Sequence, residues 1–326
     1  MQLTHATGII SAELEEVEKV LEENTASEIP LVEEISQYLL GSGGKRIRPC
    51  VLLLASGACG LRNGKERILS AAAVELIHTA SLLHDDVVDE AKLRRGRTSP
   101  NIVWGNKASV LVGDFMLARA LELLNACGML ELFRSVTRSS ARLAEGQVLE
   151  VMSSTRLIDY TEELYLTIVE RKTASLIECS GEAGAILAGA PAAFGAALRQ
   201  YGLNLGIAFQ ITDDALDYSA NEEEFGKAIG QDLGEGKITL PLLYSLRQAS
   251  QGEREAVKGI IESGAIGKEE IDYVFNIVER YNGVARCLKT AERYAEAAKK
   301  SLSSLPESPY LESLASIADF VKERRV

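Results

Sequence analysis

Three aspartates close a long apolar stretch early in the chain. Asp85, Asp86 and Asp89 stand in the segment LLHDDVVDEAKLRRG, residues 82–96. On a helix, positions i and i+4 share a face, so Asp85 and Asp89 would point the same way. Carboxylates so placed repel one another, and a divalent cation removes that repulsion. One such motif is as consistent with a solvated acidic helix end as with a metal site.

The same spacing returns in QITDDALD, where Asp213, Asp214 and Asp217 again follow an apolar helical stretch. Two solvated helix ends have no need of matching spacing. Inward-facing carboxylates from two helices of a bundle can build one metal site at the mouth of a cavity. Magnesium suits them, because it takes oxygen ligands and is usually held by one or two carboxylates together with substrate phosphates. His78 and His84 are too few to indicate zinc or a di-iron centre.

Magnesium with phosphates predicts basic residues nearby, and several segments supply them. The segment GGKRIRP, residues 43–49, places three cations and free backbone amides at a helix start, which is a ready phosphate site. Arg94 and Arg95 follow Asp85 by nine and ten residues. Three further lysines lie in weakly polar or glycine-containing segments: Lys172, Lys227 and Lys237. Taken singly, each of these lysines is more typical of a solvated surface charge.

Together these motifs resemble those of the trans-isoprenyl diphosphate synthases, the head-to-tail prenyltransferases, and among them the long-chain polyprenyl type such as octaprenyl diphosphate synthase. The resemblance covers Gly43 to about Leu243 and includes, in chain order, GGKRIRP, the first aspartate motif, RRG, KT, FQ and the second aspartate motif. It implies a transferase that condenses isopentenyl diphosphate with an allylic diphosphate, repeatedly, to a long all-trans polyprenyl diphosphate. It also implies Mg²⁺ as cofactor, with Mn²⁺ able to substitute, and a homodimer formed through apolar helix faces.

The resemblance further implies roles for individual residues. The aspartates of the two motifs would hold magnesium ions that bridge to the allylic diphosphate: Asp85, Asp86, Asp89, Asp213, Asp214 and Asp217. The same diphosphate would contact Arg94, Lys172 and Lys237, and would lie close to Lys227. The diphosphate of isopentenyl diphosphate would be held by Lys45, Arg48, His78 and Arg95. Thr173 and Gln210 resemble the polar residues near the reacting carbons. Gln231 departs from the family pattern, in which asparagine is commoner, and His84 is expected to be a core histidine.

The chemistry such residues support is ionisation followed by condensation. Magnesium and cationic side chains stabilise a departing diphosphate, so the allylic carbon–oxygen bond can ionise in a site that excludes water. The olefin of isopentenyl diphosphate then attacks the cation. Loss of a proton, with the released diphosphate as the expected acceptor, regenerates an allylic diphosphate five carbons longer. No protein nucleophile or covalent intermediate is required.

Three other functions compete with this interpretation. A class I terpene cyclase would carry a different second metal motif and a richly aromatic cavity, whereas aromatic residues make up only 6% of this chain. A head-to-head squalene or phytoene synthase has no place for GGKRIRP. An inactive regulatory subunit of a two-component prenyl synthase would be expected to lose the aspartates, and all six are present.

The pattern of the chain predicts an all-α fold with one large helical domain over residues 1–326, and the resemblance implies a single helical bundle with a central cavity. Apolar residues recur at intervals of three and four, and no stretch alternates as a strand does. The seven prolines lie near the starts and stops of helical patterns. We expect helices near residues 11–25, 30–41, 47–59, 65–92, 107–126, 129–153, 160–188, 192–219, 238–250, 253–264, 268–281, 284–303 and 308–324. The Ala- and Gly-rich segment 181–198 predicts closely packed helices there.

Composition indicates which kinds of partner and which cellular compartment suit the protein. Lys and Arg number 35 against 47 Asp and Glu, a net charge of -12, which disfavours binding to a nucleic-acid backbone. The five cysteines are scattered and odd in number, which fits neither a disulfide framework nor a zinc site and indicates a reducing cytoplasm. The first twenty residues lack the pattern of a secretory signal, and no stretch is apolar enough to span a membrane.

Small residues before the first aspartate motif predict a long product. Ala80 and Ser81 lie about one helical turn before Asp85, where a bulky aromatic would end synthesis at ten or fifteen carbons. Ile77 and Val74 continue the same face with aliphatic side chains. A distant floor could come from the helix after Gly128, through Leu130, Leu132 or Phe133. We expect a product of about thirty carbons or more.

Overall fold

Helices form most of the protein, as the periodicity of the sequence predicts. The computed structural model describes residues 6–94, 96–153, 160–218, 230–234, 236–264 and 266–323. The elements are η1 (Gly8–Ile10), α2 (Ser11–Thr25), α3 (Pro30–Leu40), α4 (Ile47–Ala58), α5 (Lys65–Val88), β1 (Leu93–Arg94), β2 (Arg97–Thr98), α6 (Pro100–Val103), α7 (Asn106–Ala126), α8 (Leu130–Ser153), α9 (Glu162–Val169), the π-helical η3 (Glu170–Ala174), α10 (Ser175–Leu187), α11 (Ala192–Asp217), α13 (Gln231–Gly234), α14 (Leu240–Leu246), α15 (Gln251–Ser263), α16 (Lys268–Arg280), α17 (Gly283–Ser301), η4 (Leu302–Ser304) and α18 (Pro309–Glu323).

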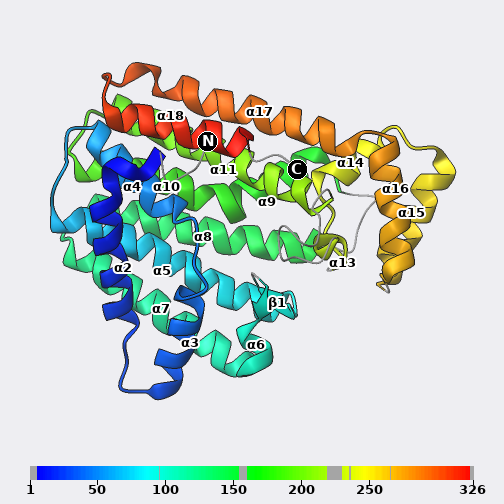
Figure 1. Cartoon of the computed structure of the whole chain (residues 1–326), viewed down its shortest axis with the longest axis horizontal. Coiled ribbons are helices and arrows are strands. Elements are labelled where there is room, and N and C mark those ends of the chain that lie inside the picture. The colour runs from blue at the N-terminus through cyan, green and yellow to red at the C-terminus, as the bar shows by residue number, and fades with distance from the viewer. Residues whose placement is uncertain are drawn as a thin grey trace.

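The long helices pack along one axis around α10. Helix α10 contacts α4, α5, α8 and α11, while α5 packs on α7 and α11 packs on α17. Figure 1 shows α5, α8, α11 and α17 running roughly along the length of the molecule, with α2 crossing one end and the α15–α16 pair standing across the other. Burial of one face of each amphipathic helix accounts for this arrangement. The all-α bundle predicted from the sequence is therefore confirmed.

The close packing predicted for the Ala- and Gly-rich segment is present between α10 and α11. A Cβ atom on Gly181 would lie 2.3 Å from the carbonyl oxygen of Leu198, and one on Gly202 would lie 2.4 Å from that of Ile177. Both distances are shorter than non-bonded atoms allow, so these positions accept no larger residue without a shift of backbone. Glycine here lets two helix backbones approach each other directly.

Three details of the helix prediction are wrong. The helix expected over residues 65–92 ends at Val88, because Glu90 takes the left-handed conformation with φ of 50°. A short hairpin of β1 and β2 follows, although no strand was expected; its pairs are Leu93 with Thr98 and Arg94 with Arg97, and Gly96 makes the turn with φ of 75°. The helix expected over residues 160–188 is interrupted by the π-helical η3.

Apolar side chains gather in one large core and a second one toward the far end. The first joins α2, α4, α5, α8, α10, α11 and α18, and the second joins α9, α11, α14, α15, α16 and α17. Helix α11 contributes to both cores, and Tyr294 of α17 packs against both. Among the helices of the described residues, none is long and apolar enough to cross a membrane.

Candidate functional site

The first aspartate motif lies at the C-terminal end of α5. Asp89 caps the helix, and its backbone N–H donates to the carbonyl oxygen of Asp85. Asp85 is half-buried, and burial raises the pKa of its carboxyl to about 6, while the charge of Lys172 opposes that rise. The repulsion and desolvation that the sequence predicts for these carboxylates are thus present in the fold.

The middle aspartate of this motif is buried and paired with an arginine. Asp86 is completely buried, and its Oδ1 accepts from Nε of Arg94 at 2.6 Å and lies 2.5 Å from Nη2. Arg94 itself stands on β1, so the unexpected hairpin carries the cation back to the helix end. The structure therefore joins two predicted site residues, and Asp86 fixes the guanidinium of Arg94.

The second motif ends α11 in a more buried environment. Asp214 is 3% exposed, and its two oxygens accept hydrogen bonds from Tyr165 and Gln210 at 2.6 and 2.7 Å. Burial, together with the charge of Asp232, raises the pKa of the Asp214 carboxyl. Asp213 is half-buried, and Asp217 accepts from the backbone N–H of Asp232 at 3.3 Å.

Two lysines connect the motifs across the space between them. Nζ of Lys237, in the segment after α13, lies 2.7 Å from Oδ2 of Asp89. Lys172 pairs with Glu150 of α8, and its positive charge favours the ionised form of Asp85 by lowering the pKa of that carboxyl. The backbone N–H of Lys237 donates to the carbonyl oxygen of Asp232, whose own N–H donates to Asp217. Lys237 therefore lies next to both aspartate motifs.

A cavity of about 90 Å³ lies between these elements. The predicted residues that line it are Lys172, Thr173, Gln210, Asp214 and Lys237. The remaining lining residues are Glu150, Tyr160, Tyr165, Ile168, Val169, Asp232, Ile238 and Thr239. Five residues predicted from separate sequence motifs thus meet in one cavity.

The π-helical η3 positions two of them. Lys172 and Thr173 lie within Glu170–Ala174. A Cβ on Gly146 of α8 would lie 2.5 Å from the backbone nitrogen of Lys172, and one on Gly206 of α11 would lie 2.6 Å from Cα of Ala174. Glycine on both sides therefore lets α8 and α11 close on this segment. Single π turns inside α-helices occur frequently at functional sites.

The GGKRIRP segment leads into α4, and its Arg46 and Lys45 make different kinds of contact. Arg46, in the left-handed conformation with φ of 48°, pairs with Glu18 at 2.6 Å and with the buried Glu75 at 3.2 Å. Its charge therefore joins α2, α4 and α5. Lys45 is exposed, with Nζ 5.3 Å from the ring centroid of Phe209, the neighbour of Gln210 on α11. The segment thus lies beside the same part of α11 as the cavity.

The other predicted residues have varied positions. Arg48, in the first turn of α4, and His78 of α5 are both half-buried. His84 is a third exposed, with Nε2 3.2 Å from the carbonyl oxygen of Val110 and 3.4 Å from Asp114, so the expectation of a core histidine is wrong. The predictions for Arg95, Lys227 and the side chain of Gln231 lie outside the described residues.

Sequence reasoning missed Tyr165 and Glu150. Tyr165 precedes Lys172 by seven residues, about two helical turns, and Glu150 stands one turn after Gly146 on α8. For Tyr165, that helical spacing from a predicted residue was the available signal, whereas Gly146 was not a predicted site residue and gave no signal for Glu150. An acidic or aromatic residue on a helix is common, however, so the spacing alone would not have separated them from their neighbours.

The donor set suits a hard divalent cation, although the carboxylates do not form a metal cluster by themselves. In the part of the chain that the structure describes, no three His, Cys, Asp or Glu side chains gather as a metal site requires. Asp214 of the second motif lines the cavity instead, and Asp89 of the first motif contacts Lys237 of the cavity lining. Such an arrangement fits a cation that takes its remaining ligands from a phosphate group and water.

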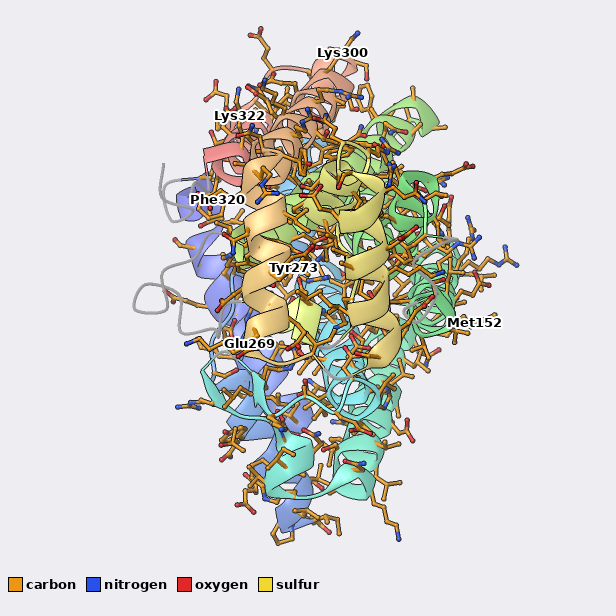
Figure 2. All side chains as sticks on the ribbon, turned by 90° about the vertical axis from the view of Figure 1, so that its right-hand side faces the viewer. Met152, Glu269, Tyr273, Lys300, Phe320 and Lys322 are labelled. Carbon is orange, nitrogen blue, oxygen red and sulfur yellow. The ribbon has the colours of Figure 1, made fainter. Side chains whose placement is uncertain are left out.

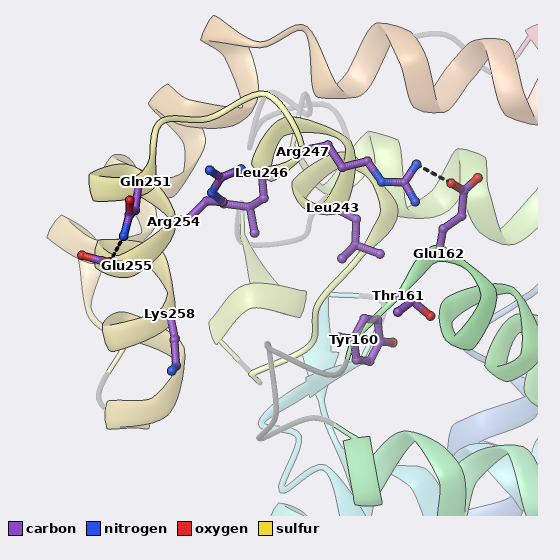
Figure 3. A pocket seen from close by; sticks show the side chains of 10 residues that line it. All are labelled: Tyr160, Thr161, Glu162, Leu243, Leu246, Arg247, Gln251, Arg254, Glu255 and Lys258. Carbon is purple, nitrogen blue, oxygen red and sulfur yellow. Dashed lines mark hydrogen bonds and ion pairs between the residues drawn. The ribbon is translucent and has the colours of Figure 1, made fainter.

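A larger groove of about 500 Å³ adjoins the cavity and shares Tyr160 with it. Figure 3 shows Arg247 paired with Glu162 on one side, and Gln251 with Glu255 on α15 opposite. None of the predicted site residues is among the described residues that line this groove.

Comparison with known proteins gives consistent matches along the whole chain. The family model for polyprenyl synthetase matches residues 29–278. An all-trans-nonaprenyl-diphosphate synthase (geranyl-diphosphate specific) of Rhodobacter capsulatus is 39% identical over 94% of each chain. A short chain isoprenyl diphosphate synthase of Methanothermobacter thermautotrophicus is 40% identical over 89% of each. The crystal structure of a Caulobacter crescentus polyprenyl synthase, complexed with calcium and isoprenyl diphosphate, superposes with a TM-score of 0.96 at 37% identity, covering 100% of this chain and 98% of that one.

Proposed function

Because the chain belongs to the polyprenyl synthetase family, we propose that the cavity between its two aspartate motifs condenses isopentenyl diphosphate with an allylic diphosphate. The enzyme is a trans-polyprenyl diphosphate synthase, a transferase of prenyl groups, and it repeats the condensation to build a long chain. The observation that carries the assignment to this cavity is its pair of lysines: Lys237 contacts Asp89, and the positive charge of Lys172 lowers the pKa of Asp85. A site with carboxylates on two helix ends and cations between them suits a metal-bridged diphosphate.

The allylic diphosphate would bind at the mouth of this cavity. Magnesium or manganese would be held by the two motifs, chiefly by Asp85, Asp89, Asp213 and Asp217, and would offset the charge that develops on the departing diphosphate. Arg94, held in place by Asp86, would donate to the same group. Lys172 and Lys237 would exchange their present carboxylate partners for diphosphate oxygens. By family resemblance, Lys227 would lie close to that diphosphate as well.

Isopentenyl diphosphate would bind on the other side of the reacting carbons. Its diphosphate would be held by Lys45, just before α4, by Arg48 in the first turn of α4, and by His78 of α5. The family resemblance adds Arg95. The contact between Lys45 and Phe209 supports this placement, because Phe209 precedes Gln210 on α11. Thr173 and Gln210 would lie between the two diphosphates and direct their dipoles at the carbocation. The released diphosphate would accept the proton lost after each addition.

Three further properties belong to the same proposal. One catalytic domain spans residues 1–326, which the contribution of α11 to both cores supports. The enzyme forms a homodimer through α7 and α8, where Leu111 is 67% and Met152 68% exposed. Met152 projects outward near the end of α8 in Figure 2. It works in the cytoplasm, which the five free cysteines support. Light scattering would measure a dimer at twice 35.3 kDa.

Incubation with radiolabelled isopentenyl diphosphate, farnesyl diphosphate and Mg²⁺ tests the function. We expect linear polyprenyl diphosphates, and no turnover in EDTA. Asp85→Ala or Asp213→Ala should each lower kcat by about 10²- to 10³-fold, the usual effect of deleting one electrostatic group at a reacting centre. Asp272→Ala, which removes an exposed aspartate of α16, is the matched control and should leave turnover unchanged. Undiminished turnover in EDTA would refute the metal-dependent mechanism, and a cyclic hydrocarbon product would indicate a terpene cyclase.

A further inference from the structure

A chain of hydrogen bonds runs from a buried tyrosine to the predicted reaction centre. The hydroxyl of Tyr165, 3% exposed on α9, donates to Oδ2 of Asp214 at 2.6 Å. Oδ1 of Asp214 accepts from Nε2 of Gln210 at 2.7 Å. Oε1 of Gln210 in turn accepts from the hydroxyl of Thr173 at 2.9 Å. All four side chains line the same cavity.

The order of donors along this chain has one consistent direction. Tyr165 donates to one oxygen of Asp214 and the NH₂ group of Gln210 donates to the other, which leaves the carbonyl oxygen of Gln210 to accept from Thr173. The hydroxyl hydrogen of Thr173 then points at Gln210. Its oxygen lone pairs are consequently left for the cavity, where positive charge would develop on the allylic carbon.

We propose that Tyr165 is a positioning residue, which acts through Asp214 to fix the orientation of Gln210 and Thr173. This inference rests on the proposed function, because it concerns the same reacting carbons. Tyr165 occupies one oxygen of Asp214 and so directs the other oxygen at Gln210. Without the phenol hydroxyl, the buried carboxylate is free to rotate toward other donors, and the amide of Gln210 loses its fixed direction.

Tyr165→Phe removes the hydroxyl and keeps the ring. We expect kcat to fall about tenfold or more, as for loss of a hydrogen bond to a charged group, with KM for isopentenyl diphosphate changed less than twofold. The matched control is Tyr201→Phe. Tyr201 is also fully buried, and its hydroxyl donates to the carbonyl oxygen of Leu314 at 2.7 Å, away from the site. Both variants should lose similar thermal stability, whereas only the first should lose kcat.

A double-mutant cycle separates positioning from general loosening of the structure. If Tyr165 acts through Gln210, then Tyr165→Phe combined with Gln210→Ala should be no slower than Gln210→Ala alone. Losses that multiply would overturn the proposal. Asp214→Asn keeps the volume of the side chain and serves if Tyr165→Phe does not fold. Asparagine keeps only one accepting oxygen, so it cannot accept from both Tyr165 and Gln210. We therefore expect kcat to fall again, and an unchanged kcat would also overturn the proposal.

The two hypotheses fail in different ways. Wild-type protein that forms no polyprenyl diphosphate from the two substrates refutes the proposed function. An active wild type, together with a Tyr165→Phe variant as active as Tyr201→Phe, refutes the positioning role of Tyr165 and leaves the function intact.

Discussion

Substitution of Ser81 by phenylalanine should shorten the product. Ser81 is half-buried on α5, where its Oγ donates to the carbonyl oxygen of His78 at 2.8 Å. Ala80 is 2% exposed and packs in a small cluster with Val112 and Met116 of α7. A phenylalanine at Ala80 would overpack that cluster, at a typical cost of about 1–3 kcal/mol in stability. Ser81 has more room, so the change there tests chain length with less disturbance of the fold.

The size of the effect follows from the geometry of α5. A rise of about 1.5 Å per residue places Ser81 about 6 Å, and Val74 about 16 Å, from Asp85 along the helix axis. One turn, about 5.4 Å, is close to the length of one isoprene unit. A ring at Ser81 would therefore stop the growing chain about two units before Val74. From a wild-type product of about thirty carbons or more, we expect Ser81→Phe to give fifteen or twenty.

Reverse-phase chromatography of the dephosphorylated products measures this length directly. Leu130→Phe is the matched control, because Leu130 is 62% exposed and so cannot be the floor of an internal chain, as one sequence prediction held. Leu132, by contrast, is completely buried in the large core. A Ser81→Phe enzyme that turns over with the wild-type product length would refute the reasoning, since α5 would then not line the growing chain. Wild-type synthesis that stops at fifteen carbons would do the same.

The remaining predictions concern binding, charge and packing. Arg48→Ala should chiefly raise KM for isopentenyl diphosphate and Lys237→Ala should chiefly impair the allylic substrate; equal effects on both substrates from both variants in steady-state kinetics would contradict the assignment. Arg46→Ala should lower the free energy of unfolding by about 3–5 kcal/mol in urea titrations, because it leaves the buried Glu75 without its cation. KM should change little, and a raised KM at unchanged stability would indicate instead that Arg46 binds substrate. Gly202→Ala should lower the free energy of unfolding by about 1–3 kcal/mol through overpacking, and with it the melting temperature. Gly195→Ala on the same helix, where the nearest atom is 3.7 Å away, should not; equal melting temperatures of the two variants would contradict the close packing.

Local pattern was sufficient for most of the helices. Periodicity and proline positions predicted α2 over residues 11–25 as the structure has it, and predicted α16 to within one residue. These signals suffice because an amphipathic face, a proline and a capping residue act within a few positions of each other. The end of α5 was predicted wrongly for the opposite reason, because no local signal indicates the contact between Arg94 and Asp86. The left-handed Glu90 belongs to the chain reversal that helps carry Arg94 back to Asp86.

The types and spacing of the site residues were also readable from the sequence. Two Asp-Asp-x-x-Asp motifs, GGKRIRP and the scattered lysines predict diphosphate and metal chemistry without a structure. Spacing alone, however, predicts the same role, that of a metal ligand, for all three aspartates of a motif. The structure separates them, because Asp86 and Asp214 are buried against their own partners while Asp85 and Asp213 are only half-buried.

Contacts between segments far apart in the sequence decided which of these residues meet in the site. Tyr165 and Asp214 are 49 positions apart, and Lys237 and Asp89 are 148 apart. The π turn that positions Lys172 and Thr173 lies against Gly146 of α8 and Gly206 of α11. The sequence by itself determined which residues share a helical face, since that depends on a spacing of 3.6 residues per turn. Only the tertiary structure decided which faces meet, because the side chains that satisfy a buried polar group come from helices far apart in the chain.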